Sequence, residues 1–112
     1  MNIPKKLHSF KPSEIINKFS HPLLKKSKDG LEFFISPACL EHGRLLVVTS
    51  RKVGNAVTRN KIRRRLKALY YQNHLFQIPY DIIIRVRPEA TKLNFDQIKV
   101  IFFDVLNKFK TS

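Results

Sequence analysis

The chain has 112 residues and a formal net charge of +14, with 22 Lys and Arg against 8 Asp and Glu. A hydrophobic fraction of 43%, with nine Phe and three Tyr, suffices for one core and excludes a disordered polybasic tail. The single cysteine cannot form an internal disulfide, and no apolar run approaches the roughly 20 residues that span a bilayer. We therefore expect one cytoplasmic domain over residues 1–112, flexible at residues 1–8 and 110–112.

The first half of the chain contains a helical pattern, a turn and a strand pattern. Residues 12–19 begin with proline, which a helix tolerates in its first turn. The apolar side chains of this segment are expected on one side of the helix: Ile15, Ile16 and Phe19. Residues 25–30 are rich in lysine, end in glycine and are typical of a turn. Residues 31–36 alternate as in a strand, which places Phe34 on the face opposite Leu31, Phe33 and Ile35.

The second half of the chain alternates strand and helix patterns. Residues 44–50 are rich in Val and Leu and indicate a second strand, and residues 80–87 indicate another. Between them, residues 57–74 have the apolar spacing of one buried helical stripe, formed by Ile62, Leu66, Leu69 and Tyr70. A last amphipathic helix is expected to begin near Asn94, with Gln97 as its capping-box partner. This order predicts an α/β layer with helices packed against a small sheet.

The positive charge is concentrated between residues 51 and 67. This stretch contains no acid and eight basic residues: Arg51, Lys52, Arg59, Lys61, Arg63, Arg64, Arg65 and Lys67. Because the apolar stripe occupies one side of the helix, the remaining arc is almost entirely cationic. Like charges recur four residues apart, which slightly destabilises a helix, whereas an ordinary solvated face mixes both signs. The pattern therefore favours contact with a polyanion, and the excess of Arg suits bidentate phosphate binding.

Residues 50–67 resemble the signature of the protein subunit of bacterial ribonuclease P. The shared pieces are a strand that ends in Ser and two basic residues, then Val53-Gly54-Asn55-Ala56, Arg59-Asn60 and a basic helix. The order of the flanking elements agrees over nearly the whole chain. The resemblance implies an α/β (α+β) two-layer sandwich, with a mixed sheet of about four strands and three helices. It also implies that the basic helix lies in a βαβ unit with a left-handed crossover, the opposite of the general rule.

The resemblance further implies an RNA-binding accessory subunit of an endoribonuclease that removes the 5′ leader of precursor tRNA. Its partners would be the large catalytic RNA, which requires Mg²⁺ for catalysis, and precursor tRNA, with no membrane and no obligate protein partner. The protein itself is expected to contain no cofactor, no metal site and no catalytic residue. Consistent with that expectation, the carboxylates are scattered along the chain, and the histidines lack the spacing of metal ligands.

The implied RNA contacts divide between two surfaces. The catalytic RNA would contact Arg51, Lys52, Asn55, Arg59, Asn60, Lys61, Arg63, Arg64, Arg65 and Lys67. The single-stranded leader would lie between the first helix and one face of the sheet, against Ile15, Phe19, Phe34, Arg59 and Asn60. Ile15 stands where the family commonly has Phe, so one stacking ring is missing from this chain. Gly54 is expected to have a backbone conformation or a close approach that a side chain would block.

Two other functions fit the composition. A ribosomal or other structural RNA-binding protein would use the same basic helix, and composition alone does not separate it from the first function. The motif Val-Gly-Asn-Ala followed by Arg-Asn favours the ribonuclease P subunit. A membrane-surface or DNA-compacting protein is the third alternative, which fits less well because the apolar stripe of the basic helix is needed for the core.

Overall fold

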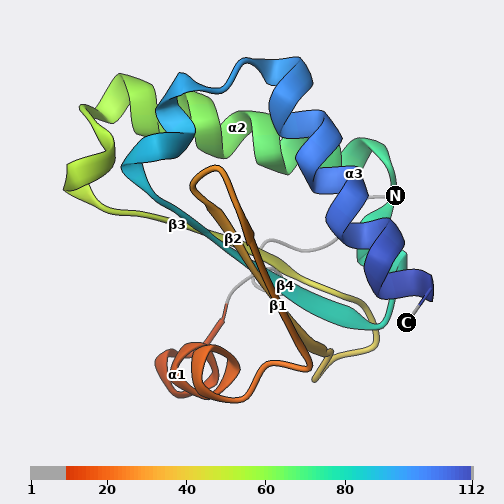
Figure 1. Cartoon of the computed structure of the whole chain (residues 1–112). Helices are drawn as coiled ribbons and strands as arrows, with labels where there is room; N and C mark the ends of the chain where they lie inside the picture. The colour runs from red at the N-terminus through yellow and green to blue at the C-terminus, as the bar shows by residue number, and fades with distance from the viewer. Residues whose placement is uncertain (1–9, 112) are drawn as a thin grey trace.

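The computed structural model describes residues 10–111, with side chains up to residue 108. Within these residues, four strands form one sheet and three α-helices lie on its two faces (Figure 1). The elements are α1 (Pro12–Ser20), β1 (Leu24–Lys28), β2 (Leu31–Pro37), β3 (Leu45–Thr49), α2 (Ala56–Gln72), β4 (Tyr80–Val86) and α3 (Phe95–Thr111). The predicted α/β sandwich is confirmed. The expected flexible residues 1–8 and 112 lie outside the described residues, and residues 110 and 111 are the last of α3.

The sheet is mixed and has the strand order β1-β2-β4-β3. β2 pairs antiparallel with both β1 and β4, whereas β3 and β4 are parallel neighbours. Parallel neighbours require a crossover connection, and here that connection contains α2. The basic helix is therefore part of a βαβ unit, as the resemblance implies. None of the described helices is both long and apolar enough to cross a membrane.

The turn predicted over residues 25–30 is shorter than expected. Residues 25–28 belong to β1, which pairs with β2 as a hairpin in which Lys28 faces Leu31. The turn itself is Asp29 and Gly30, both with positive φ (50° and 91°), the combination that a type I′ hairpin turn requires. The strand β1 was not predicted, because this lysine-rich segment lacks an apolar alternation. Lysines on an edge strand discourage pairing with another chain, so their presence fits the position of β1.

The core lies between the sheet and the layer formed by α2 and α3. The predicted stripe of α2 is buried against the inward side chains of the strands, and its four members are Ile62, Leu66, Leu69 and Tyr70. From α3, Phe102 packs edge-on against Phe33 of β2, with ring centroids 6.0 Å apart. The alternation predicted for β2 is confirmed, because Leu31, Phe33 and Ile35 all belong to this core.

Helix α1 lies on the opposite face of the sheet from α2 and α3 (Figure 1). Its predicted apolar side is partly wrong, because Ile16 is 68% exposed while Lys18 is buried. Residues at positions i, i+3 and i+4 share a side of a helix, so the side that contains Lys18 and Phe19 also contains Ile15 and leaves Ile16 rotated toward solvent. The sheet surface that α1 covers is called the α1 face below.

Candidate nucleic-acid interface

The basic helix begins at a sequence that specifies its start. The 3₁₀ turn η2 (Arg51–Val53), whose two basic residues are exposed, leads into Gly54 at φ +150°, a conformation that L side chains rarely adopt. This is the conformation expected for that glycine. The Oδ1 atom of Asn55 then caps the helix by accepting a hydrogen bond from the backbone N–H of Thr58 at 2.9 Å. The side-chain oxygen of Asn55 is thus engaged in starting the helix.

The outward side of α2 forms a continuous polar and basic surface. Asn60, Lys61, Arg64 and Lys67 are exposed, as the helical spacing predicts. This side contains a shallow depression. The residues that line it are three or four positions apart in the sequence, so they share one face of the helix. We call this surface the basic face of α2, and its members are Val57, Asn60, Arg63, Arg64 and Lys67.

Three of the predicted RNA-binding arginines of α2 are partly buried, and one of them, Arg63, is a member of the basic face. Arg63 is half-buried and donates hydrogen bonds to Thr49 Oγ1 at 2.8 Å and to Asn60 Oδ1 at 3.3 Å. The guanidinium of Arg65 lies 5.8 Å from the ring centroid of Phe95 at the start of α3. Arg59 is half-buried, and its Nε atom has no acceptor among the described residues. These long side chains lie along the protein surface, as arginine stems commonly do.

The protein's own acids leave the charge of α2 unneutralised. Within residues 10–108, the ion pairs involve only four acids, which are Glu14, Glu32, Asp81 and Asp104. Their basic partners are Lys18, Arg44, Arg85, Arg87 and Lys108, none of which belongs to α2. A uniformly positive surface repels itself and attracts polyanions. The basic face therefore has the electrostatics of a nucleic-acid contact.

The residues predicted to contact a single strand lie in two places. Ile15 and Phe19 lie on α1 and Phe34 on β2, whereas Arg59 and Asn60 lie near the start of α2. Phe19 and Phe34 pack edge to face, with ring centroids 4.8 Å apart. Phe34 faces away from the core as predicted, but it is only 3% exposed because Phe19 and neighbouring side chains cover it. Phe19 and Ile15 remain half-exposed.

Two cations that were not among the predicted site residues lie beside this aromatic pair. The guanidinium of Arg85 lies 5.6 Å from the Phe19 ring centroid and 5.4 Å from that of Phe34, and Lys25 Nζ lies 5.3 Å from Phe34. Glu32 fixes Arg85 by accepting hydrogen bonds from its Nε at 2.7 Å and its Nη2 at 3.2 Å. The hydrogen bond from Arg85 is the main reason why the pKa of Glu32 is lowered. The sequence signal for Arg85 was the alternation of β4, which places the side chain of Arg85 on the same face of the sheet as that of Ile83.

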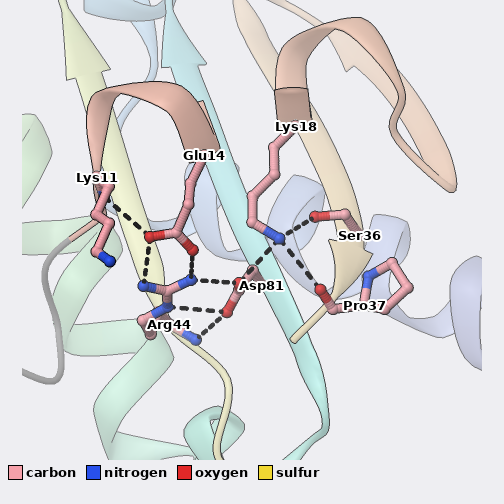
Figure 2. A network of polar contacts seen from close by, with 7 residues as sticks. All are labelled: Lys11, Glu14, Lys18, Ser36, Pro37, Arg44 and Asp81. Carbon is pink, nitrogen blue, oxygen red and sulfur yellow. Dashed lines mark hydrogen bonds and ion pairs between the residues drawn. The ribbon is translucent and has the colours of Figure 1, made fainter. Parts of the chain in front are cut away.

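A buried polar network connects α1 to the sheet (Figure 2). Lys18 Nζ lies 3.0 Å from Asp81 Oδ2 on β4, and Arg44 Nη2 joins the same oxygen at 3.0 Å. Arg44 Nη2 also donates to Glu14 Oε2 at 2.6 Å. The carboxylates regarded as scattered in the sequence are therefore partly brought together, because Glu14 and Asp81 share Arg44. An acid within the otherwise apolar start of β4 was the sequence signal for this network.

Comparison with known proteins identifies the family. A family model described as Ribonuclease P matches residues 10–110, which is most of the chain. The chain belongs to the ribonuclease P protein family. Among the described residues, no group of three His, Cys, Asp or Glu side chains could hold a metal ion.

Individual ribonuclease P proteins agree with this assignment. The ribonuclease P protein component of Petrotoga mobilis is 32% identical over 79 residues, covering 66% of this chain and 67% of the relative. That of Citrifermentans bemidjiense is 47% identical over 55 residues, covering 49% of this chain and 47% of the relative. The alignments thus span about half to two thirds of these relatives. The structure of the Staphylococcus aureus RNase P protein matches with a TM-score of 0.80 at 24% identity, over 91% of this chain and 94% of that chain, which supports the fold.

The Glu14 contact gives this ribonuclease P protein a testable acid sensitivity. Hydrogen bonds from Arg44 and from the backbone N–H of Lys11 lower the pKa of Glu14 to about 2 from its ordinary 4.5. A carboxyl whose pKa is depressed on folding stabilises the protein above its ordinary pKa, and this contribution is lost as the pH falls toward the folded value. Glu14→Gln should therefore be less stable than wild type at neutral pH, and the difference should disappear between pH 4.5 and about 2. Thermal unfolding over this pH range checks it, and a constant difference would contradict it.

Proposed function

We propose that the chain is the RNA-binding subunit of a ribonuclease P ribonucleoprotein that removes the 5′ leader of precursor tRNA. The basic face of α2 would bind the catalytic RNA, and the α1 face would bind the leader. The proposal rests on one observation about α2: one side of this helix is buried in the core, and its other side presents basic residues that no acid of the described residues neutralises. Hydrolysis is proposed to be carried out by the RNA subunit and its Mg²⁺, in line with the resemblance to the ribonuclease P family.

On the basic face, the exposed residues are proposed to contact phosphates. Arg64 and Lys67 are exposed and have no ion-pair partner among the described residues, so RNA binding breaks no internal ion pair at either position. Arg63 is different because Thr49 and Asn60 already orient it. Fixing a guanidinium before binding reduces the rotamer entropy lost on binding, so Arg63 is suited to a bidentate contact with one phosphate. Arg51 and Lys52 would extend this surface beyond the start of α2.

On the α1 face, Phe19 is the proposed stacking platform for a leader base. Phe34 is too covered to receive a base itself, and it supports the Phe19 ring from the sheet. Arg85 and Lys25 lie beside the two rings, where they would meet the phosphates that flank a stacked base. Single-strand binding proteins commonly combine aromatic platforms with adjacent cations in this way. Arg59 and Asn60 are proposed to contact the leader from the start of α2.

Replacing Phe19 with Ala tests the leader proposal. A stacked base contributes about 1–3 kcal/mol, so the affinity of the holoenzyme for precursor tRNA should fall about fivefold or more relative to mature tRNA. The affinity of the protein for the catalytic RNA should not change. Ile16→Ala is the matched control, because Ile16 lies on the same helix and is 68% exposed. Equilibrium binding of both tRNAs measures the effect, and equal losses for both would contradict a leader contact.

Cleavage assays test the function as a whole. The catalytic RNA should cleave precursor tRNA at low Mg²⁺ substantially better with this protein than without it, because the added cations stabilise the complex that divalent ions otherwise support. Absence of any enhancement would exclude the ribonuclease P role. Enhanced cleavage would also separate this function from that of a ribosomal RNA-binding protein with a similar basic helix.

A further inference from the structure

Helix α1 is attached to the sheet by an unusual set of contacts. It has nine residues, which is too short for a stable isolated helix, so its position depends on tertiary contacts. The buried residue of this helix is a lysine, Lys18, rather than an apolar side chain. Ile16 points to solvent, and Ile15 and Phe19 are only half-buried. Much of the attachment is therefore polar and depends on specific partners.

Those partners converge on one carboxylate (Figure 2). Asp81 of β4 is completely buried, and it accepts hydrogen bonds from the Arg44 backbone N–H at 2.9 Å and from Arg44 Nη2 at 3.0 Å. Lys18 Nζ approaches the same carboxylate at 3.0 Å. Glu14 joins through Arg44, and Glu14 and Lys18 are four residues apart on one side of α1. Two successive turns of the helix are thus connected to the same point of the sheet.

The network also reaches the strand that contains Phe34. Lys18 Nζ donates to Ser36 Oγ at 3.0 Å and to the carbonyl oxygen of Pro37 at 3.1 Å, both at the end of β2. Phe34 lies two residues before Ser36, and Phe19 directly follows Lys18. One ammonium group therefore fixes the helix that contains Phe19 against the strand that contains Phe34. Hydrogen bonds are directional, so they specify the rotation and register of α1 more narrowly than an apolar contact does.

We propose that Lys18 and Glu14 are positioning residues for leader recognition, which hold α1 through Asp81 and Arg44 so that Phe19 meets Phe34 edge to face. Neither residue needs to touch RNA. Their effect passes through the orientation of Phe19 and thus depends on the proposed function of the α1 face. Substitution of these residues should alter leader recognition and leave the basic face of α2 unaffected.

The primary test replaces Lys18 with Met, an unbranched side chain that is one atom shorter and has no charge. Selectivity of the holoenzyme for precursor over mature tRNA should fall about fivefold or more, the same lower limit as for loss of a stacked base. Affinity for the catalytic RNA should be unchanged. Lys18→Arg, which retains a donor cation, should keep most of the selectivity. Lys99→Met is the control for charge, because Lys99 is exposed on α3.

A double-substitution cycle separates positioning from a general loss of stability. If Lys18 acts through Phe19, adding Lys18→Met to Phe19→Ala should cause no further loss of precursor selectivity. Additive losses would overturn the proposal, because they mean that Lys18 contributes independently of the ring. Wild-type selectivity of a folded Lys18→Met protein would overturn it as well.

Glu14→Gln keeps the proposal testable if Lys18→Met does not fold. Glu14 is more accessible and its replacement leaves the Lys18–Asp81 pair intact, so the protein should fold and show a smaller loss of selectivity in the same direction. Unchanged selectivity in this variant would count against positioning. If Phe19→Ala itself leaves selectivity unchanged, the leader function of the α1 face is wrong. If Phe19→Ala lowers selectivity while Lys18→Met and Glu14→Gln do not, only the positioning role is wrong.

Discussion

Replacing Asp81 with Asn should destabilise the protein by about 3–5 kcal/mol, the usual cost of removing one partner from a buried ion pair. The side chain of Asp81 is fully buried and faces both Lys18 and Arg44. The amide of Asn is nearly the same size but neutral, so Lys18 would lose the carboxylate it pairs with and Arg44 would keep only Glu14 as an ion-pair partner among the described residues. Because domains of this size are stable by only about 5–15 kcal/mol, this loss is a large share of the total. Urea unfolding with a constant m-value measures it.

The matched control for Asp81 is Asp104→Asn on α3. Asp104 pairs with Lys108 at 3.2 Å across one helical turn, and both side chains are about half-exposed (48% and 63%). An exposed pair of this type stabilises a helix by about 0.5 kcal/mol or less. The same chemical change should therefore have a very different effect at the two positions. Similar losses of stability at both positions would show that the buried network contributes no more than a surface pair.

Local patterns in the sequence predicted the elements whose periodicity decides their structure. The stripe of α2 could be predicted because Ile62 and Leu66 repeat at helical spacing, and the structure buries both. The two faces of β2 followed from its alternation in the same way. These predictions succeeded because apolar burial dominates the free energy of folding and depends on position within one element.

The details of the α1 face could not be predicted, because they depend on partners that are distant in the sequence. Lys18 is 18 residues from Ser36, and Arg44 is 37 residues from Asp81. Without those partners, a lysine in a short amphipathic helix is expected in solvent, and the apolar Ile16 is expected in the interior. The burial of Phe34 was missed for a related reason. Its face was correct, but the sequence did not show that Phe19 would cover it.

The basic residues of α2 are not equivalent, because some of them have partners in other parts of the chain. Helical spacing placed the whole set on the outer arc, and for Arg64 and Lys67 this placement is confirmed by their exposure. Arg63 instead lies against the end of β3, because Thr49, 14 residues earlier, offers an acceptor. A substitution at Arg63 would therefore change both RNA binding and the junction of β3 with α2. Arg64 and Lys67 give the cleaner test of phosphate contact.

Replacing Arg64 and Lys67 together with Ala should weaken binding to the catalytic RNA by about 10- to 100-fold near physiological salt. Each phosphate contact contributes about 0.7–0.9 to the slope of log affinity against log salt concentration, so the slope should decrease by about 1.4–1.8. Thermal stability should hardly change, because both side chains are exposed and lack ion-pair partners within residues 10–108. Titrations of the protein with the catalytic RNA at several salt concentrations provide both quantities.

The control for this prediction is the pair Lys92→Ala and Lys99→Ala. Both lysines are exposed and lie outside α2, so their replacement removes the same charge from another part of the surface. If long-range attraction alone were responsible, the two double variants would show the same affinity for the catalytic RNA and the same salt dependence. Such attraction depends on net charge more than on the position of each charge. Direct phosphate contact predicts a reduced slope only for Arg64 and Lys67, since only they lie on the basic face. Equal slopes in both variants would therefore rule out the basic face as the docking surface, even if overall affinity had fallen.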